Sequence, residues 1–160
     1  MSNFMNAVNK QRRAHWLAAH HLRPLAKVYE MWIYLIHNSF IPADCEIGEG
    51  TTFGYKGIGV VVHKRARIGK NCMIAQNVTI GGRSGHYEVP VIGDDCYIGA
   101  GAKVLGPIKI GNNVTIGANA VMMKDAPDGT VWGGFLRKCC EIKTASEWGS
   151  ASWQLGGCIA

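Results

Sequence analysis

The sequence predicts a mainly β protein, a parallel β-helix of about 4–5 coils with a short helical cap. Three observations support this fold class. An aliphatic residue recurs at six-residue spacing from Ile47 to Met122, glycine follows most of these residues, and residues 1–36 show helical spacing instead. The 160 residues include 21 Gly, well above the usual share of about 7 %. Their even spacing indicates a repeat rather than disorder.

The repeat has a simple physical interpretation. Short parallel strands joined by tight turns, three to a coil, place one aliphatic residue inward every sixth position. A sandwich of short strands would instead show period-two alternation and hairpin turns. Turn positions carry residues that tolerate left-handed backbone, such as Asn71, Asp95, Asn113 and Asn119. The inward positions are Ile47, Phe53, Val62, Ile68, Ile74, Ile80, Ile92, Ile98, Val104, Ile110, Ile116 and Met122.

Three hexads form a coil of about 18 residues, which predicts how the inward residues stack. We expect one edge from Val62, Ile80, Ile98 and Ile116, a second from Ile68, Val104 and Met122, and a third from Ile74, Ile92 and Ile110. Two segments break the register: residues 54–61, and residues 82–89, which we expect to form a loop standing off the coils. Irregular segments of a repeat often carry function.

Residues 1–40 form a separate amphipathic helical segment in this interpretation, followed by a β-helix domain at 41–138 and a tail at 139–160. Pro24 is expected to divide the segment into two helices. One role for them is a cap over the open end of the repeat. Another is an interfacial helix resting on anionic lipid. The two roles are compatible.

Charge and cysteine usage limit the classes of partner. The formal net charge is +6, which suits a phosphate-bearing ligand or an anionic membrane surface. No stripe of alternating aromatic and basic residues occurs, so we do not expect nucleic-acid binding. Cys45, Cys72 and Cys96 occupy the small-residue slot of the hexad and are expected to be buried thiols. The N-terminus shows no signal-peptide pattern, which predicts a cytoplasmic protein, peripheral at the inner face of the membrane if its helices bind lipid.

The stretches IGKNCMIAQNVTIGG and VIGDDCYIGAGAKVLGPIKIGNNVTIGANAVMMKDAPDG resemble the hexapeptide-repeat, left-handed parallel β-helix acyltransferases. The similarity covers about residues 41–134 and is greatest to serine acetyltransferase and to sugar or polysaccharide O-acetyltransferases. It implies a left-handed coil, acetyl-CoA as donor, a homotrimer and active sites in clefts between subunits. No metal-ligand spacing is evident.

The sequence departs from serine acetyltransferases at their catalytic segments. Those enzymes have a long helical domain before the repeat. They also carry an Asp-His-Ala-Thr-Gly segment that holds the catalytic His, where this chain has residues 54–59 without a His. Their second active-site His precedes a proline, and here Val89 precedes Pro90. Polysaccharide-type relatives share a run resembling residues 57–63, which ends at His63.

Acetyl transfer to a hydroxyl needs a base and donors for the oxyanion. His63 is our candidate base, since imidazole titrates near neutral pH. His86, in the second irregular segment, is a candidate to position the acceptor or the oxyanion. Tyr55 stands where relatives keep their base and is a candidate to orient the acceptor, with Lys56 as a weaker alternative base. Asp44 is a candidate partner of His63. An ordinary surface residue is the alternative for each.

We expect coenzyme A to lie in a groove below His63, made by a column of Gly81, Gly99 and Gly117. The full set of predicted cofactor-binding residues is Gly81, Gly82, Arg83, Gly99, Ala100, Lys103, Gly117, Ala118, Lys124 and Lys138.

The leading functional hypothesis is an acetyl-CoA-dependent O-acetyltransferase acting on a sugar hydroxyl of a surface polysaccharide or its precursor. The alternative acceptor is L-serine, in cysteine synthesis. A hypothesis of another class is a trimeric β-helix that has lost catalysis and serves as a binding scaffold. Acetylation of a nucleotide-sugar amine is also compatible with the sequence.

Overall fold

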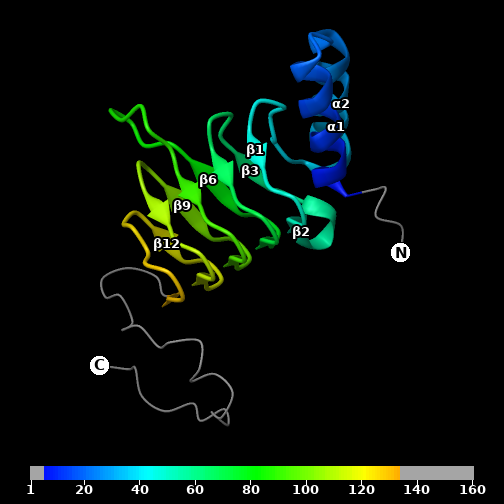
Figure 1. Cartoon of the computed structure of the whole chain (residues 1–160). Helices are drawn as coiled ribbons and strands as arrows, with labels where there is room; N and C mark the ends of the chain where they lie inside the picture. Colours follow the sequence, from blue (N-terminus) through cyan, green and yellow to red (C-terminus); the bar gives the residue numbers. More distant parts are fainter. Residues whose placement is uncertain (1–5, 134–160) are drawn as a thin grey trace, which may run out of the picture.

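The structure is a computed structural model that describes residues 6–133. Figure 1 shows two helices, α1 (Ala7–Ala19) and α2 (Arg23–His37), beside one end of a stack of coils. The coils form a left-handed parallel β-helix of about four turns, as the sequence predicts. Each coil contributes one short strand to each of three parallel sheets.

The three sheets are the faces of the solenoid. The chain passes from face 1 to face 2 to face 3 in every coil. Face 1 contains β1 (Glu46–Ile47), β4 (Arg67–Ile68), β7 (Val91–Ile92) and β10 (Lys109–Ile110). Face 2 contains β2 (Thr52–Phe53), β5 (Met73–Ile74), β8 (Tyr97–Ile98), β11 (Thr115–Ile116) and β13 (Val131–Trp132). Face 3 contains β3 (Val61–Val62), β6 (Thr79–Gly81), β9 (Lys103–Leu105) and β12 (Val121–Met122).

Two corners matter for the site. The loop corner, between faces 3 and 1, consists of residues 63–66, 82–90, 106–108 and 123–125. The bend corner, between faces 2 and 3, consists of residues 54–60, 75–78, 99–102 and 117–120. It begins with η2 (Gly54–Gly57), a short 3-10 turn.

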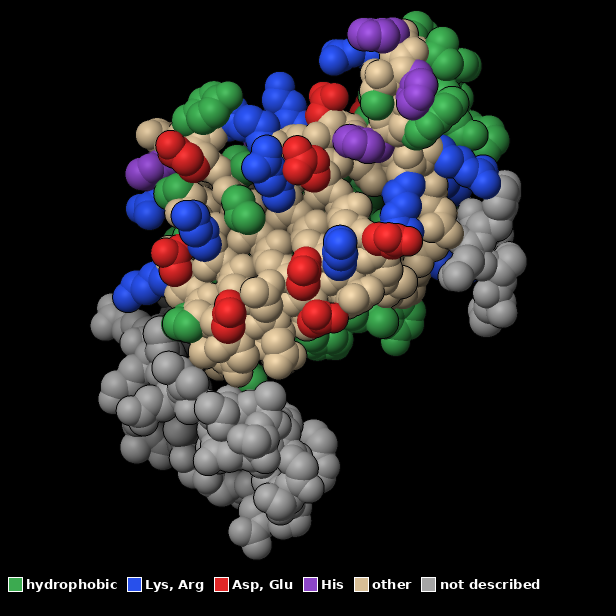
Figure 2. Space-filling view, viewed as in Figure 1, with side chains coloured by type: hydrophobic (Ala, Val, Ile, Leu, Met, Phe, Trp, Pro, Cys, Tyr) green, Lys and Arg blue, Asp and Glu red, His purple; other side chains and the backbone are tan. Residues whose placement is uncertain are grey.

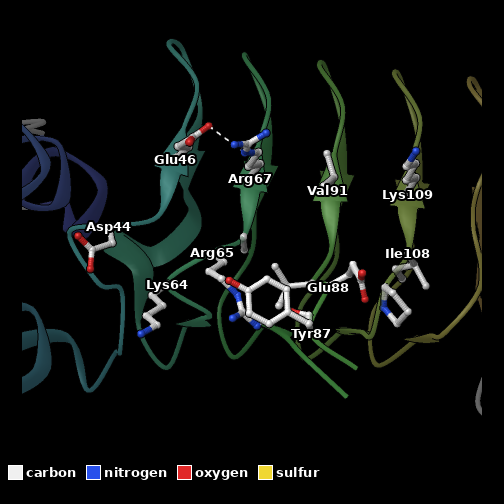
Figure 3. Close-up of a pocket in the computed structure, with 13 residues that line it drawn as sticks. Asp44, Glu46, Lys64, Arg65, Arg67, Tyr87, Glu88, Val91, Ile108 and Lys109 are labelled. Atoms are coloured by element: carbon white, nitrogen blue, oxygen red, sulfur yellow. Dashed lines mark hydrogen bonds and ion pairs between the residues drawn. The ribbon is translucent and has the colours of Figure 1, made fainter. Parts of the chain in front are cut away.

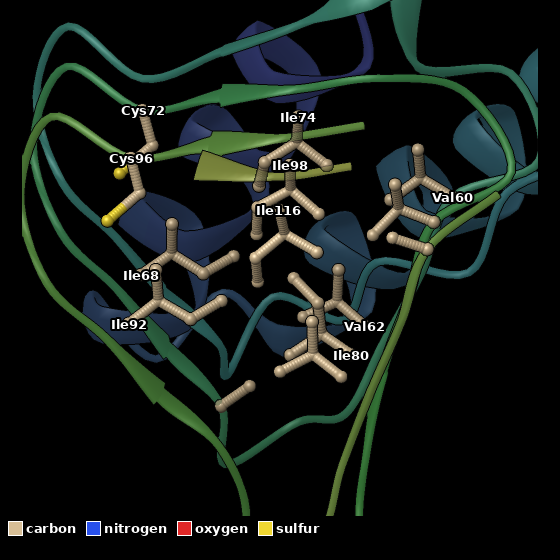
Figure 4. Packing of buried hydrophobic residues seen from close by; sticks show 14 of the residues in the cluster. Val60, Val62, Ile68, Cys72, Ile74, Ile80, Ile92, Cys96, Ile98 and Ile116 are labelled. Carbon is tan, nitrogen blue, oxygen red and sulfur yellow. The ribbon is translucent and has the colours of Figure 1, made fainter. Parts of the chain in front are cut away.

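The six-residue period identifies the inward residues correctly. All the predicted inward positions are buried except Ile47, which is half-buried. Figure 4 shows some of them, such as Ile74, Ile98 and Ile116, stacked inside the coils. At the expected turn positions, Asn71, Asp95, Asn113 and Asn119 have φ of 53°, 56°, 53° and 55°. Short polar side chains lower the cost of this left-handed conformation.

The predicted stacking is wrong beyond residue 80. Ile98 and Ile116 stack on Ile74 in face 2, rather than on Ile80. Val104 and Met122 continue the column of Val62 and Ile80 in face 3, and Ile92 and Ile110 continue that of Ile68 in face 1. The reason is the loop at 82–90, which occupies a single corner. The twelve-residue step from Ile80 to Ile92 therefore advances the chain by one face rather than two.

The helices cap the first coil, as predicted. Ala7, Val8 and Ile33 belong to the same buried cluster as the solenoid interior. The side-chain amide of Gln11 donates to the carbonyl of Cys45 at 2.9 Å. Arg12 Nη2 donates to the carbonyl of Gly48 at 2.9 Å. Pro24 lies in the first turn of α2, where its missing N–H costs nothing.

The three cysteines of the repeat are buried, which confirms that prediction. Cys45, Cys72 and Cys96 are each at most 2 % exposed, and Figure 4 shows Cys72 and Cys96 on successive coils. Burial raises the pKa of the Cys45 thiol to about 12. This thiol is therefore protonated and unreactive at neutral pH.

Candidate functional site

His63 and the loop that carries His86 lie at the same corner of the solenoid. His63 opens the turn after β3, and its backbone N–H donates to the carbonyl of Ile80 on the next coil at 2.8 Å. The chain then leaves that coil after Gly81 to form the long loop of residues 82–90, which projects from the coils in Figure 1. The fold thus brings together two imidazole-bearing segments that are more than twenty residues apart.

Arg65 ties this loop to the His63 turn. Its Nη2 donates to the carbonyl of Tyr87, and its guanidinium carbon lies 3.8 Å from the centroid of the Tyr87 ring. Arg65 Nε is buried and makes no hydrogen bond within the described residues. A cation stacked on an aromatic ring is attractive, so Arg65 holds the otherwise exposed loop against the corner.

A hollow of about 700 Å³ lies between this loop and face 1. Figure 3 shows the outward side chains of β1, β4, β7 and β10 along one side, with Tyr87 and Glu88 of the loop opposite. Glu46 and Arg67 form an exposed ion pair at 3.2 Å on its rim. The charged residues that line the hollow are Lys64, Arg65, Arg67, Lys109, Asp44, Glu46 and Glu88.

The imidazole of His63 has a defined hydrogen-bond partner. The backbone N–H of Arg65 donates to Nδ1 at 3.2 Å. A nitrogen that accepts a hydrogen bond carries no proton, so the neutral ring holds its proton on Nε2. Burial, followed by the charges of Arg65 and Lys64, lowers the pKa of His63 below its ordinary value. His63 therefore presents a neutral ring with an N–H donor at Nε2.

Tyr55 belongs to the bend corner, at the opposite end of β3. Tyr55 and Lys56 adopt left-handed backbone conformations, with φ of 49° and 62°, which is costly for two consecutive residues with side chains. Ser39 supports this bend by donating to the carbonyl of Gly57 and accepting from the N–H of Val60. Tyr55 is 73 % exposed. Tyr55 and His63 thus lie at opposite ends of β3, and no described contact joins them within one chain.

The predicted glycine column below His63 is wrong. The positions stacked beneath His63 are Gly81 and Leu105, while Gly99 and Gly117 follow Ile98 and Ile116 at the bend corner. The error comes from the stacking register. A column of small residues does exist, but it lies below the Tyr55 bend and consists of Gly54, Ala75, Gly99 and Gly117.

Packing between coils requires glycine at some of the predicted coenzyme-binding positions and not at others. A Cβ at Gly99 would lie 2.6 Å from the backbone nitrogen of Ala118, so coil stacking itself requires glycine there. At Gly81 and Gly82 the nearest atoms would be 3.6 Å and 3.5 Å away, an ordinary contact. The fold does not require glycine at these two positions. Their glycines leave the backbone beside His63 without a side chain.

The other predicted coenzyme contacts are distributed over three places. Gly82, Arg83 and Lys124 lie at the loop corner, with Gly81 at the end of β6 beside it, and Gly99, Ala100, Gly117 and Ala118 lie at the bend corner. Lys103 lies on face 3 between them, with its Nζ bound to Asn77 O at 2.9 Å and Thr79 Oγ1 at 3.1 Å. Lys138 lies outside the described residues. Asp44 lines the hollow and, within the described part of the chain, makes no hydrogen bond to His63.

Family models and known proteins match this chain. The bacterial transferase hexapeptide model matches residues 90–124, and the hexapeptide repeat of succinyl-transferase matches residues 74–104. Serine acetyltransferase of Mycobacterium tuberculosis is 37 % identical over 153 residues, which cover 94 % of this chain and 66 % of that protein. The chain is a hexapeptide-repeat protein of the serine acetyltransferase-like branch.

Solved structures agree with this assignment. Serine acetyltransferase of Brucella abortus in complex with coenzyme A has a TM-score of 0.79 and 28 % identity, covering 85 % of this chain and 55 % of that one. Soybean serine acetyltransferase complexed with serine has a TM-score of 0.76 and 38 % identity, covering 83 % and 55 %. This hexapeptide-repeat protein therefore spans little more than half the length of these two enzymes.

Sequence reasoning missed the contact that shapes the site of this hexapeptide-repeat protein. Arg65 lies at an ordinary turn position of the six-residue pattern, and Tyr87 is one of several residues in the second register break. The available signal was the length of the second register break, because a long loop at one corner must pack against the turn of the preceding coil. That Arg65 is the residue of this turn that contacts the loop is known only from the folded structure.

Proposed function

We propose that this hexapeptide-repeat protein is an acetyl-CoA-dependent O-acetyltransferase. One observation carries the proposal: His63 and the loop of His86 are held at one corner by Arg65 and Tyr87. The corner belongs to a fold shared with serine acetyltransferases, including one solved with coenzyme A. A scaffold without catalysis would have no need of two imidazole-bearing segments tied together beside the open backbone of Gly81 and Gly82.

L-serine is the first acceptor that we propose. The relatives reported above are named serine acetyltransferases, and one was solved with serine bound. The comparisons thus favour serine, the alternative in the sequence analysis, over a polysaccharide sugar. The absence of a His in residues 54–59 means that serine would have to be activated from another position.

The reaction assigns complementary roles to the two histidines. The acceptor oxygen attacks the thioester carbonyl carbon, its proton passes to a base, and the carbon–sulfur bond breaks to release the thiol. His63, with its proton on Nε2, is suited to donate a hydrogen bond to the developing oxyanion. His86 is exposed on the loop, so its ring can reach the acceptor hydroxyl and take its proton. This reverses our expectation that His63 is the base.

A homotrimer would complete the site. Identical chains arranged in a ring make heterologous contacts, in which one patch of each copy meets a different patch of the next. The bend corner and the loop corner flank face 3 and are two such different patches. Their contact would place Tyr55 of one copy beside His63 and His86 of its neighbour, where its hydroxyl can orient the acceptor.

A sugar hydroxyl is the second candidate acceptor, and the hollow is the observation that favours it. Tyr87 is 74 % exposed, and its ring stands over a space edged by Asp44, Glu46 and Glu88. An aromatic ring offers an apolar surface to the flat face of a sugar, and carboxylates accept hydrogen bonds from hydroxyls. The expected membrane contact would be made by the helices, which adjoin the Asp44 end of this hollow.

Thiol release from acetyl-CoA tests the proposal directly. The full chain is assayed with L-serine, with simple sugars and with bacterial glycans, and the acetylated product is identified by mass. Turnover that depends on an acceptor supports acetyl transfer, and the productive acceptor distinguishes the two candidates. Absence of turnover together with absence of coenzyme A binding in calorimetry would contradict the proposal and favour the scaffold.

A further inference from the structure

The outward side of α2 is an apolar surface that the fold does not use. We define the α2 face as the eight large apolar side chains on this helix and just after it that are each at least half exposed. The most exposed is Leu35, at 70 %. Figure 2 shows green hydrophobic side chains gathered over the helices. The members are Leu25, Val28, Met31, Trp32, Tyr34, Leu35, Ile36 and Phe40.

The opposite side of α2 packs against the rest of the protein. Ala26, Ile33 and His37 are buried. The Glu30 carboxylate accepts a hydrogen bond from the backbone N–H of Ala43 at 2.7 Å. The α2 face is therefore additional to the core. Soluble monomers rarely leave more than a few hundred Å² of contiguous apolar surface exposed, so a patch of this kind indicates a partner.

Charge distinguishes between the possible partners. Residues 6–37 carry five Lys or Arg and a single acidic residue, Glu30, so their formal charge is +4 with His neutral. Arg23 and Lys27 are exposed on α2 itself, and Arg13 is exposed on the adjacent α1. A second copy docking here would bring two positive surfaces together, whereas an anionic surface would be attracted.

We propose that the α2 face binds an anionic lipid surface, with α2 lying in the plane of the membrane interface. Neither described helix is long and apolar enough to cross a bilayer. An amphipathic helix with large apolar residues on one side and cations beside them instead inserts its apolar side at the boundary between headgroups and acyl chains. Trp32 and Tyr34 have the amphipathic rings that favour this depth. The inference is independent of acetyl transfer.

Vesicle co-sedimentation tests the proposal. We expect the full chain to sediment with vesicles of phosphatidylcholine and phosphatidylglycerol, to bind pure phosphatidylcholine far more weakly, and to dissociate as salt is raised. Met31→Gln/Leu35→Gln removes two apolar side chains from the α2 face and should weaken binding at least about tenfold. Arg23→Gln/Lys27→Gln should weaken binding to anionic vesicles only. All four side chains are exposed, so circular dichroism should show unchanged folding.

Met123→Gln is the matched control. Met123 is 53 % exposed but lies on the last coil, away from the helices, so its substitution should leave vesicle binding unchanged. Equal loss of binding in Met123→Gln would overturn the proposal, as would absence of binding by the unsubstituted chain. Self-association that Met31→Gln/Leu35→Gln abolishes, without vesicle binding, would assign the α2 face to a second copy of the chain instead.

Discussion

The backbone N–H of Arg65 donates to Nδ1 of His63 across 3.2 Å, which places the imidazole proton on Nε2. This geometry separates two roles for His63. Glutamine can place an amide N–H near the position of Nε2–H, but it cannot act as a base. We therefore expect His63→Gln to retain at least about tenfold more activity than His63→Ala, because it keeps a donor for the oxyanion. Rates of thiol release from acetyl-CoA check this. Equal inactivity of the two variants would assign His63 to proton abstraction.

His86 should be required for turnover, because it is the group proposed to take the proton of the acceptor hydroxyl. Glutamine keeps a polar side chain of similar length but cannot accept this proton. His86→Gln should therefore lower kcat by about 10²-fold or more, the usual contribution of a general base. Rates of thiol release from acetyl-CoA measure this, and a kcat within about threefold of that of the unsubstituted protein would show that another group is the base.

Arg65 should stabilise the loop more than it stabilises the fold. Arg65→Ala removes the contacts with Tyr87, so trypsin should cleave after Arg83, in the loop, at least about fivefold faster, because local opening becomes more frequent. Arg67→Ala is the matched control, since its ion pair with Glu46 is exposed and such pairs contribute little. Similar cleavage rates in the two variants would show that Arg65 does not anchor the loop.

Two glycines should respond differently to a methyl group. Gly99→Ala places a Cβ 2.6 Å from the backbone nitrogen of Ala118 and should cost about 2–4 kcal/mol of unfolding free energy, because neighbouring coils must separate. Gly81→Ala has room, with its nearest atom at 3.6 Å, and should change stability by less than about 1 kcal/mol. Chemical denaturation of both variants tests this, and comparable destabilisation would contradict the stacking described above.

Acid should weaken the packing between the helices. Lys10 Nζ lies 3.1 Å from Nε2 of His37, and both residues are buried. Burial, followed by the charges of Lys10 and Lys56, lowers the pKa of His37. The ordinary pKa of a histidine, which applies to the unfolded chain, is about 6.5. At a pH between the lowered pKa of the folded protein and this value, the unfolded chain binds more protons than the folded one. The free energy of unfolding is therefore highest above about 6.5 and decreases as the pH falls from there toward the lowered pKa of His37.

Urea denaturation at pH 7.5 and at pH 5.5 measures this effect. His37→Gln keeps a side chain that can accept from Lys10 but cannot titrate. The loss of stability on acidification should therefore be smaller in His37→Gln than in the unsubstituted protein. An identical loss in the two proteins would show that other groups account for the pH dependence.

The sequence predicts the fold well because one repeated inward residue per hexad is enough to define a coil. It does not predict the register beyond Ile80, since a twelve-residue step is compatible with an advance of one face or of two. Because of this ambiguity, Gly99 and Gly117 were predicted to lie below His63 at the loop corner, whereas they lie at the bend corner. The Arg65–Tyr87 contact was not predicted because it depends on how the loop folds back. The proton position on His63 depends on a backbone N–H that no sequence pattern marks.

Activity complementation between subunits tests directly whether two copies share one site. Tyr55→Ala and His63→Ala are each expected to be inactive, because each removes one half of every shared site. Co-expression in equal amounts forms mixed trimers, in which a shared site has both halves intact with a probability of about one quarter. We therefore predict that the mixture recovers about a quarter of the unsubstituted acetyl transfer activity. Mixed trimers that remain as inactive as the separate variants would contradict a site formed by the bend corner of one copy and the loop corner of the next.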